Sequence, residues 1–177
     1  MDVPIEDEQG AKKPEIRIRF AISSDAPSIA SVLHHSFVEY RSSYTPQAFA
    51  ATVLTIDEIE ARLRLNEGPV WAAFCEDAII GTVSAVPKGE LVYIRSMAVL
   101  PAARGLGVGA LLLKQIESYA LASGYKGLVL STTPFLHRAI RFYKHFGFHR
   151  CDEGVYDLFG TPLFTMIKTL VEETTYA

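Results

Sequence analysis

The sequence predicts a single α/β domain built on a mixed sheet. A chain of 177 residues with 49% hydrophobic side chains can bury one sizeable core, and it is short for two ordinary domains. The predicted elements begin with a strand and helices, continue through an antiparallel meander and finish in an alternation of strands and helices. This order is typical of a mixed-sheet α/β domain.

The N-terminal part of the chain predicts one strand and two helices. Residues 16–20 alternate between apolar and polar with period two, as a half-buried strand does. Asp25 is placed to cap the helix that follows it. We expect residues 38–46 to form a connecting loop and residues 55–65 to form a second helix, which Gly68 and Pro69 bring to an end.

The middle of the chain predicts three strands. Apolar runs at residues 70–75 and 78–86 flank Glu76 and Asp77, which predicts a hairpin. Residues 91–99 form the third strand, and this strand leads into a glycine-rich turn.

The C-terminal part alternates helix and strand. An apolar stripe beginning at Leu112 predicts a helix that stops at Gly124. A strand at 127–131, a helix at 134–146 and a strand at 163–170 complete the expected order.

The glycine-rich turn carries the strongest functional signal. Arg104 is followed by Gly105, Gly107 and Gly109, where the next helix opens. Glycine allows a ligand to approach the backbone, and the N–H groups and dipole of a helix start favour an anion. The junction therefore predicts a phosphate site, although a purely structural glycine turn stays open.

Spacing separates the phosphate-binding motifs. A Walker loop is excluded because no glycine in the turn precedes a lysine and a hydroxyl residue. Gly105, Gly107 and Ala110 formally match a dinucleotide fingerprint, but that motif requires an acidic residue about 20 positions later. The apolar run at 127–130 leads into serine and threonine instead, which disfavours this alternative.

Arg104, Gly107 and Gly109 form the pattern R-x-x-G-x-G, which resembles the GNAT superfamily of acyl-CoA-dependent N-acyltransferases. Residues 135–148 resemble the A-x-x-F-Y-x-x-x-G-F helix of the same family, and the two motifs stand in the family's order. The resemblance covers roughly residues 16 to 170. It implies a GNAT domain, for which we take residues 15–177, with a mostly antiparallel central sheet, a V-shaped splay between two strands, and flanking helices.

The resemblance also implies where acetyl-CoA binds. Backbone N–H groups of the glycine turn would hold the pyrophosphate, and the end of strand 91–99 would hold the pantetheine arm and polarise the thioester. Thr132 stands near the position where the family often has asparagine. The resulting set is Met97, Ala98, Val99, Arg104, Gly105, Leu106, Gly107, Val108, Gly109, Ala110 and Thr132.

Tyr143 is the predicted catalytic residue, because the family motif places a tyrosine there as general acid toward the CoA thiolate. Its position on an apolar helical stripe leaves core packing open as the alternative. Arg95 would bind either a substrate carboxylate or an internal acid. Tyr40 and Tyr44 would either shape the acceptor pocket or cover the core. No general base is evident, so we expect water to remove the amine proton.

The predicted function is N-acetyltransfer from acetyl-CoA to a primary amine of a small molecule, amino acid derivative or peptide, by direct attack. The alternative is a non-catalytic acyl-CoA-binding sensor or partner-binding module. The absence of C-x-x-C spacing around Cys75 and Cys151 argues against a zinc site, and no metal is expected.

Composition and charge indicate the expected partners, N-terminal tail and location of the protein. A net charge of -3 disfavours a nucleic acid partner. Residues 1–14 are rich in charge and predict a flexible tail. The chain contains no recognisable leader and no apolar run long enough for a membrane span, so we expect a cytoplasmic protein without a membrane partner. A homodimer is left open.

Overall fold

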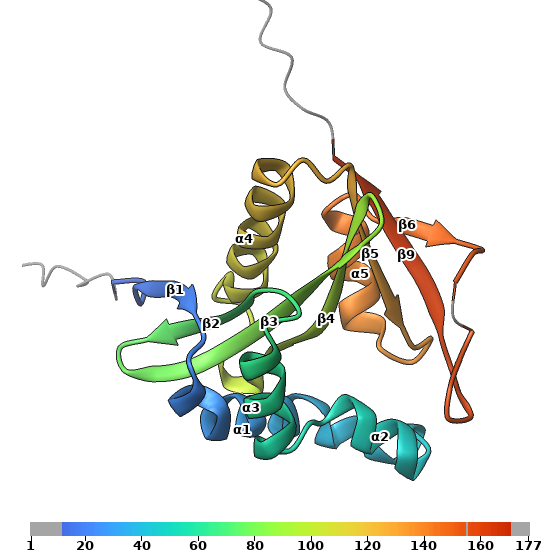
Figure 1. Ribbon diagram of the computed structural model, residues 1–177. Coiled ribbons are helices and arrows are strands. Elements are labelled where there is room, and N and C mark those ends of the chain that lie inside the picture. The colour runs from blue at the N-terminus through green and yellow to red at the C-terminus, as the bar shows by residue number, and fades with distance from the viewer. Residues whose placement is uncertain (1–11, 155, 171–177) are drawn as a thin grey trace, which may run out of the picture.

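The computed structural model describes residues 12–154 and 156–170. Its centre is a seven-stranded sheet (Figure 1). The strand order is β1-β2-β3-β4-β5-β9-β6, and every neighbouring pair is antiparallel except β4 and β5. The strands of this sheet are β1 (Ile16–Phe20), β2 (Val70–Cys75), β3 (Ala78–Lys88), β4 (Leu91–Val99), β5 (Gly127–Thr132), β6 (His149–Cys151) and β9 (Phe164–Thr169). The predicted mixed, mostly antiparallel sheet is confirmed.

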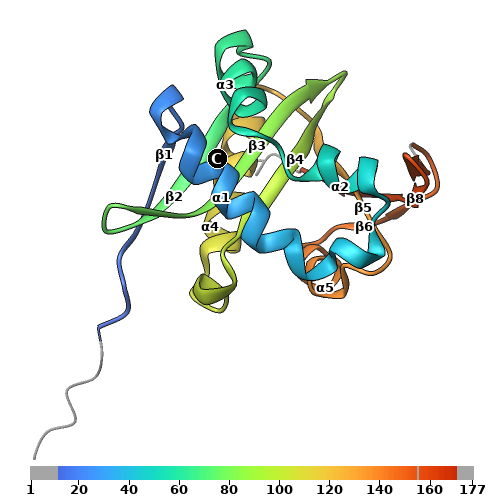
Figure 2. The same ribbon diagram turned by 90° about the horizontal axis from the view of Figure 1, so that it is seen from below.

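Helices cover both faces of this sheet. Figure 2 shows α1 and α3 in front of the sheet and α4 behind it. The helices are α1 (Ala26–Phe37), α2 (Pro46–Thr52), α3 (Ile56–Leu65), α4 (Val108–Ala122) and α5 (His137–His145). Short 3-10 turns span Ser23–Asp25, Val38–Ser43 and Pro101–Ala103, and a small hairpin joins β7 (Asp157–Leu158) to β8 (Thr161–Pro162).

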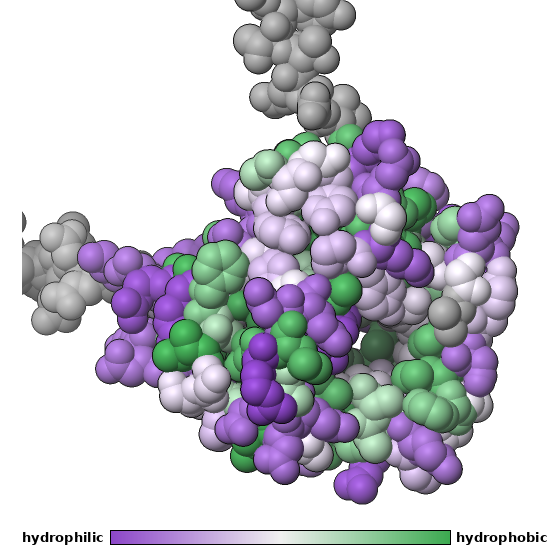
Figure 3. Space-filling view, in the orientation of Figure 1, coloured by the Kyte–Doolittle hydropathy of each residue, from purple (hydrophilic) through white to green (hydrophobic). Residues whose placement is uncertain are grey.

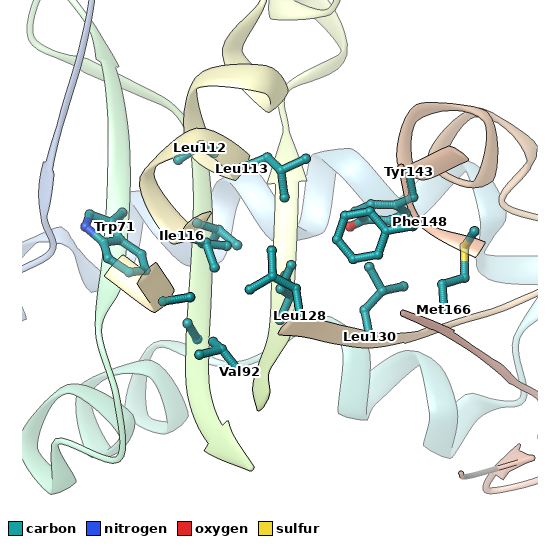
Figure 4. Packing of buried hydrophobic residues seen from close by; sticks show 14 of the residues in the cluster. Trp71, Val92, Leu112, Leu113, Ile116, Leu128, Leu130, Tyr143, Phe148 and Met166 are labelled. Carbon is teal, nitrogen blue, oxygen red and sulfur yellow. The ribbon is translucent and has the colours of Figure 1, made fainter. Parts of the chain in front are cut away.

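Successive side chains of β2 point to opposite faces of the sheet and pack into two separate hydrophobic cores. Trp71 and Ala73 pack on the face covered by α4, whereas Val70 and Ala72 pack on the face covered by α1 and α3. Figure 4 shows the first core, in which Leu112, Leu113 and Ile116 of α4 lie over Val92 and Leu128 of adjacent strands. Tyr143, Phe148, Leu130 and Met166 extend the same cluster toward β9.

The parallel pairing of β4 and β5 is short. Leu91, Val92 and Tyr93 pair with residues 127–129, and no further pairs join the two strands among the described residues. Beyond Tyr93 the strands separate, which confirms the expected V-shaped splay.

An irregularity in β4 accompanies the separation. Thr82 pairs with Ala98 and Ser84 with Arg95, so one extra residue of β4 stands opposite β3. Ser96 occupies this β-bulge with φ +52, in the left-handed region. A bulge bends a strand and redirects its side chains, and here it lies on the part of β4 that β5 has left.

Three local features differ from the sequence prediction. α2 begins inside the stretch expected to continue as loop, because Thr45 caps it and Pro46 fits its first turn. α5 begins at His137 rather than Pro134, since residues 134–135 form a turn and Leu136 is the N-cap. The carboxylate of Asp25 does not cap α1; it accepts hydrogen bonds from the N–H of Ile22 and from Arg19.

Residues 1–11 of the predicted tail at 1–14 lie outside the described residues, as do residues 171–177 of the predicted domain. Among the helices that the structure does describe, none is both long enough and apolar enough to cross a membrane.

Asp25 gives a prediction about stability and pH. Hydrogen bonds from Arg19 and Ile22 lower the pKa of its nearly buried carboxyl below the ordinary value. Stabilisation by the ionised form is therefore complete above that ordinary value, about 4, and is lost as the pH falls through the lower folded-state pKa. We expect Asp25→Asn to lower the free energy of unfolding by about 1–2 kcal/mol at neutral pH, and we expect this difference from wild type to shrink in acid.

Chemical denaturation across the acid range measures both effects. Asp77→Asn, at an exposed hairpin position, is the matched control. A pH-independent difference between wild type and Asp25→Asn would contradict the assigned role of the carboxylate.

Candidate active site

A cavity of about 790 Å³ occupies the V between β4 and β5. Its walls come from the C-terminal end of α1, the turn after it, α2, α3, β4, the start of α4, β5 and α5. Figure 3 shows the surface hollowed between β4 and the C-terminal strands, above α2. The volume lies in the range of small-molecule sites.

This cavity brings together almost all of the residues that the sequence selected. The lining includes Tyr40, Tyr44, Arg95, Met97, Ala98, Val99, Arg104, Gly105, Gly107, Val108, Gly109, Ala110, Thr132 and Tyr143. Leu106 is not part of the lining: its side chain packs against the α4 core, and its N–H donates to the carbonyl of Ala103 at 3.4 Å.

The glycine turn has the geometry of an anion site. Gly105 and Gly107 have φ of +83 and +82, and a Cβ at either position would enter open space. The N–H groups of Val108, Gly109 and Ala110 open the 15-residue helix α4 and find no acceptor among the described residues. Free N–H groups at the positive end of a helix dipole attract a phosphate.

Gly109 serves a different purpose in the same turn. A Cβ there would lie 3.2 Å from the Phe142 ring of α5, so glycine allows the first turn of α4 to approach that helix closely.

Arg104 is held by α1 and the turn that follows it. Its Nη2 lies 2.9 Å from Oε1 of Glu39 and donates to the carbonyl of Ser36 at 3.4 Å. The guanidinium therefore contacts a backbone carbonyl and a surface carboxylate beside the turn. Phosphate binding by its side chain stays a prediction.

Tyr143 lies on α5 with its ring in the core and its hydroxyl at the cavity. The ring contacts Phe142 and Phe148, and the hydroxyl donates to Sδ of Met97 on β4 at 3.4 Å. Figure 4 shows the ring beside Phe148. Burial raises the pKa of Tyr143 above its ordinary value, and nearby Tyr93 raises it further. The packing role and a proton-donating role are thus compatible in one residue.

Tyr44 and Tyr40 form one end of the cavity. Tyr44 is buried among Phe49 and Phe135, and burial raises its pKa to about 12. Tyr40 lies 6.3 Å from Phe135, measured between ring centroids. Both tyrosines therefore cover part of the core and line the cavity at once.

Thr133 adds a polar atom that the sequence did not single out. Its Oγ1 is buried in the cavity wall near the hydroxyl of Tyr44, and it forms no hydrogen bond of good geometry among the described residues. An unpaired buried hydroxyl is costly, so a polar group of a ligand is a fitting partner for it. Thr132, the predicted residue, is its immediate neighbour and also lines the cavity.

Arg95 has an internal acidic partner. Its Nη2 lies 2.7 Å from Oε2 of Glu67, and its Nε donates to Oγ of Ser84 at 3.3 Å. Of the two predicted partners of Arg95, the structure contains the internal acid, Glu67. Binding of a substrate carboxylate stays a prediction.

Arg62 is the functional candidate that sequence reasoning missed. It extends from α3 to the cavity wall, where Nη1 donates to Oγ of Ser96 at the β4 bulge, 2.8 Å away. Burial and the charge of Arg95 lower the pKa of Arg62 to about 10. The sequence did carry one signal for Arg62. It lies three residues after buried Ile59, so the two residues share one face of the helix.

Acidic and imidazole groups are missing from the cavity wall as far as the chain is described. No Asp, Glu or His is among the lining residues, and no cluster of potential metal ligands occurs within the described ranges. The site can bind an anion, orient polar groups through backbone amides and hold a proton on Tyr143. It offers no carboxylate as a general base.

Comparison with known proteins agrees with this arrangement. A family model for the acetyltransferase (GNAT) family matches residues 29–148. The uncharacterized N-acetyltransferase YjgM of Escherichia coli (strain K12) is 27% identical over 132 residues, which cover 72% of this chain and 78% of that protein.

Two solved structures share the fold. The PaiA N-acetyltransferase of Thermoplasma acidophilum, in complex with coenzyme A, has a TM-score of 0.77 and 16% identity, covering 88% of this chain and 99% of its own. YncA of Salmonella typhimurium, with acetyl-CoA, has a TM-score of 0.70 and 22% identity, covering 89% and 95% respectively.

The raised pKa values give a prediction for tyrosine titration. An ordinary tyrosine ionises near pH 10, whereas Tyr44 should ionise only near pH 12 and Tyr143 also well above the ordinary range. We expect Tyr44→Phe and Tyr143→Phe each to leave the tyrosinate absorbance gained below about pH 11 unchanged. Loss of part of that absorbance in either variant would show that its hydroxyl is not buried as described.

Proposed function

Because this chain belongs to the acetyltransferase (GNAT) family and is therefore an acyltransferase, we propose that it transfers the acetyl group of acetyl-CoA to a primary amine. The acceptor is a small molecule, an amino acid derivative or a peptide, and its nitrogen attacks the thioester directly. The observation that carries this proposal is one cavity, in the V between β4 and β5, that joins an anion-binding helix start to the hydroxyl of Tyr143.

The residues present fit acetyl-CoA. Open space at Gly105 and Gly107, with free N–H groups on the first turn of α4, suits a pyrophosphate. The unpaired hydroxyl of Thr133 and the edge of β4 that β5 has left suit the amide groups of a pantetheine arm. The coenzyme A bound by PaiA and the acetyl-CoA bound by YncA support this assignment.

Backbone donors and one tyrosine would perform the chemistry. Acetyl-CoA, when bound, supplies a thioester whose carbonyl carbon an uncharged amine can attack. N–H groups of Met97 to Val99 would polarise the carbonyl oxygen. Tyr143 would give its proton to the sulfur as the C–S bond breaks and regain one from solvent.

The amine proton has no acidic side chain to receive it. Since the described lining contains no Asp, Glu or His, water would carry this proton to solvent. No observation favours the non-catalytic sensor, so that alternative is not proposed. Cytoplasmic location, a homodimer and the lack of a nucleic acid partner stay predictions from the sequence.

The test of the reaction is a panel of primary amines incubated with acetyl-CoA, with detection of free thiol and of the acetylated product by mass spectrometry. Thiol release that depends on an amine supports the proposal. Binding of acetyl-CoA without transfer to any amine in a broad panel would favour the sensor instead.

Substitution of Tyr143 tests the proton donor. Tyr143→Phe keeps the ring that packs on Phe148 and removes only the hydroxyl. General acid catalysis is worth about a hundredfold to ten-thousandfold, so kcat should fall by that order while CoA affinity and Tm change little. Tyr125→Phe, which alters a tyrosine outside the cavity lining, is the control. Equal kcat in wild type and Tyr143→Phe would assign the residue to packing alone.

Gly107 tests the anion site, and the chain offers a matched control. Gly107 and Gly124 stand at the two ends of α4 with φ of +82 and +78, and a Cβ would meet open space at both. Valine therefore strains the backbone similarly at either position. Gly107→Val alone should block the pyrophosphate and raise the Kd for CoA about tenfold or more, because charge-assisted hydrogen bonds are lost.

Titration calorimetry with CoA measures this difference, and circular dichroism confirms that both variants fold. Similar CoA affinity in folded Gly107→Val and Gly124→Val would remove the glycine turn from the proposed site.

A further inference from the structure

Two guanidinium groups lie close together on one wall of the cavity. Arg62 reaches this wall from α3, and Arg95 stands on β4 beside the bulge. Sequence motifs gave no indication of the pair, because its two members come from elements that are separated by the β2–β3 hairpin.

The two arginines differ in their partners. Arg95 forms a salt bridge with Glu67 and a hydrogen bond with Ser84. Arg62 donates to the neutral hydroxyl of Ser96 and forms no salt bridge with any residue in the described ranges. Glu58, one turn before Arg62, directs its carboxylate to the N–H and hydroxyl of Thr55 as part of a capping box.

Arg62 is therefore a half-buried cation without a bound counterion. Removing a cation from water is unfavourable unless an anion compensates for the lost hydration. A guanidinium has five N–H donors in a planar fork, and Ser96 occupies one of them. The remaining donors, beside the cavity, suit a planar anion that accepts two hydrogen bonds.

The local charge indicates which anion fits. The carboxylates of Glu67 and Glu58 both act on Arg62, so the positive charge left at this wall is small and suits a single carboxylate better than a phosphate dianion. Guanidinium and carboxylate also match each other in shape, since both are planar and can pair through two parallel hydrogen bonds.

The position of Arg62 indicates where this carboxylate belongs in the acceptor. Arg62 holds Ser96, and Ser96 directly precedes Met97, where we place the polarised thioester. Consecutive Cα atoms are about 3.8 Å apart. An anion on Arg62 would thus lie only a short distance from the attacking nitrogen.

We propose that Arg62, with Arg95 beside it, binds a carboxylate of the acceptor, so that the acceptor is an amine bearing a carboxylate a few bonds from its nitrogen, as an amino acid does. This inference rests on the proposed acetyltransfer. It names the acceptor class and assigns a substrate-binding role to Arg62, whose contact with Ser96 alone would otherwise make it a brace for the bulge.

Two conjugates of CoA test the inference by binding rather than by turnover. In one, the CoA sulfur is joined through an acetyl group to the nitrogen of glycine; in the other, glycinamide replaces glycine. The two probes differ only in whether the acceptor half carries a carboxylate. We expect wild type to bind the glycine conjugate about tenfold more tightly, since a charge-assisted pair is worth at least that factor.

Arg62→Gln should reduce this preference to near unity, leaving the Kd for the glycinamide conjugate and for CoA itself unchanged. Arg62→Lys, which keeps the charge but not the fork, should retain part of the preference. Arg64→Gln, an exposed position on the same helix, should bind both conjugates as wild type does.

The outcomes distinguish failure of the proposed function from failure of the carboxylate inference. If wild type binds neither conjugate nor CoA, the proposed function fails. If wild type binds both conjugates equally, the carboxylate inference fails and acetyltransfer stands. If Arg62→Gln weakens both conjugates and CoA alike and lowers Tm, Arg62 is only a brace for the bulge. If Arg62→Gln does not fold, Arg62→Lys remains as the test. An undiminished preference of Arg62→Lys for the glycine conjugate would contradict bidentate recognition of the carboxylate.

Discussion

The short pairing between β4 and β5 is the constraint on which the site depends. Backbone hydrogen bonds join the strands through Tyr93 and then stop, because the bulge at Ser96 bends β4 while β5 follows β9. A sheet that remained paired would satisfy its own amides and close the cavity. The separated edges instead leave polar backbone groups that a ligand can satisfy, and α1, α2 and α5 surround the opening without filling it.

Around this opening, main-chain groups are the donors available to an anion. The first turn of α4 offers N–H donors whose positions are fixed by the helix and whose approach is unobstructed at Gly105 and Gly107. Arg104 meanwhile pairs with Glu39 and joins the turn to α1. Rigid amides lose little entropy on binding, whereas a long side chain must be ordered. The backbone would therefore be the principal phosphate ligand in the proposed site, while the contacts of Arg104 with Glu39 and Ser36 join the turn to α1.

The electrostatic character of the cavity follows from which charges are paired. Acidic groups near it are committed elsewhere: Glu67 to Arg95, Glu39 to Arg104 and Glu58 to Thr55. Tyr143 stays protonated because burial disfavours its phenolate. The interior therefore presents hydrogen-bond donors, with Arg62 as its least compensated cation. Such a cavity favours ligands that bring negative charge and acceptor atoms.

The sequence by itself determined the features that arise from nearby residues. Strand and helix periodicity located most elements, and the glycine spacing located the helix start that can bind phosphate, because periodicity, capping and positive φ are local properties. Spacing also placed Tyr143 on its helix. The short helix α2 was missed, although Thr45 and Pro46 carry its start signals, since its apolar pattern is only two turns long.

Tertiary structure alone decided which distant groups meet. Arg62 and Ser96 are 34 positions apart, and their contact depends on the packing of α3 against α1 and on the bulge in β4. The sequence likewise did not identify an internal acidic partner for Arg95, and the folded chain provides one in Glu67. These contacts arise from packing and register between separate elements, and no local periodicity records them.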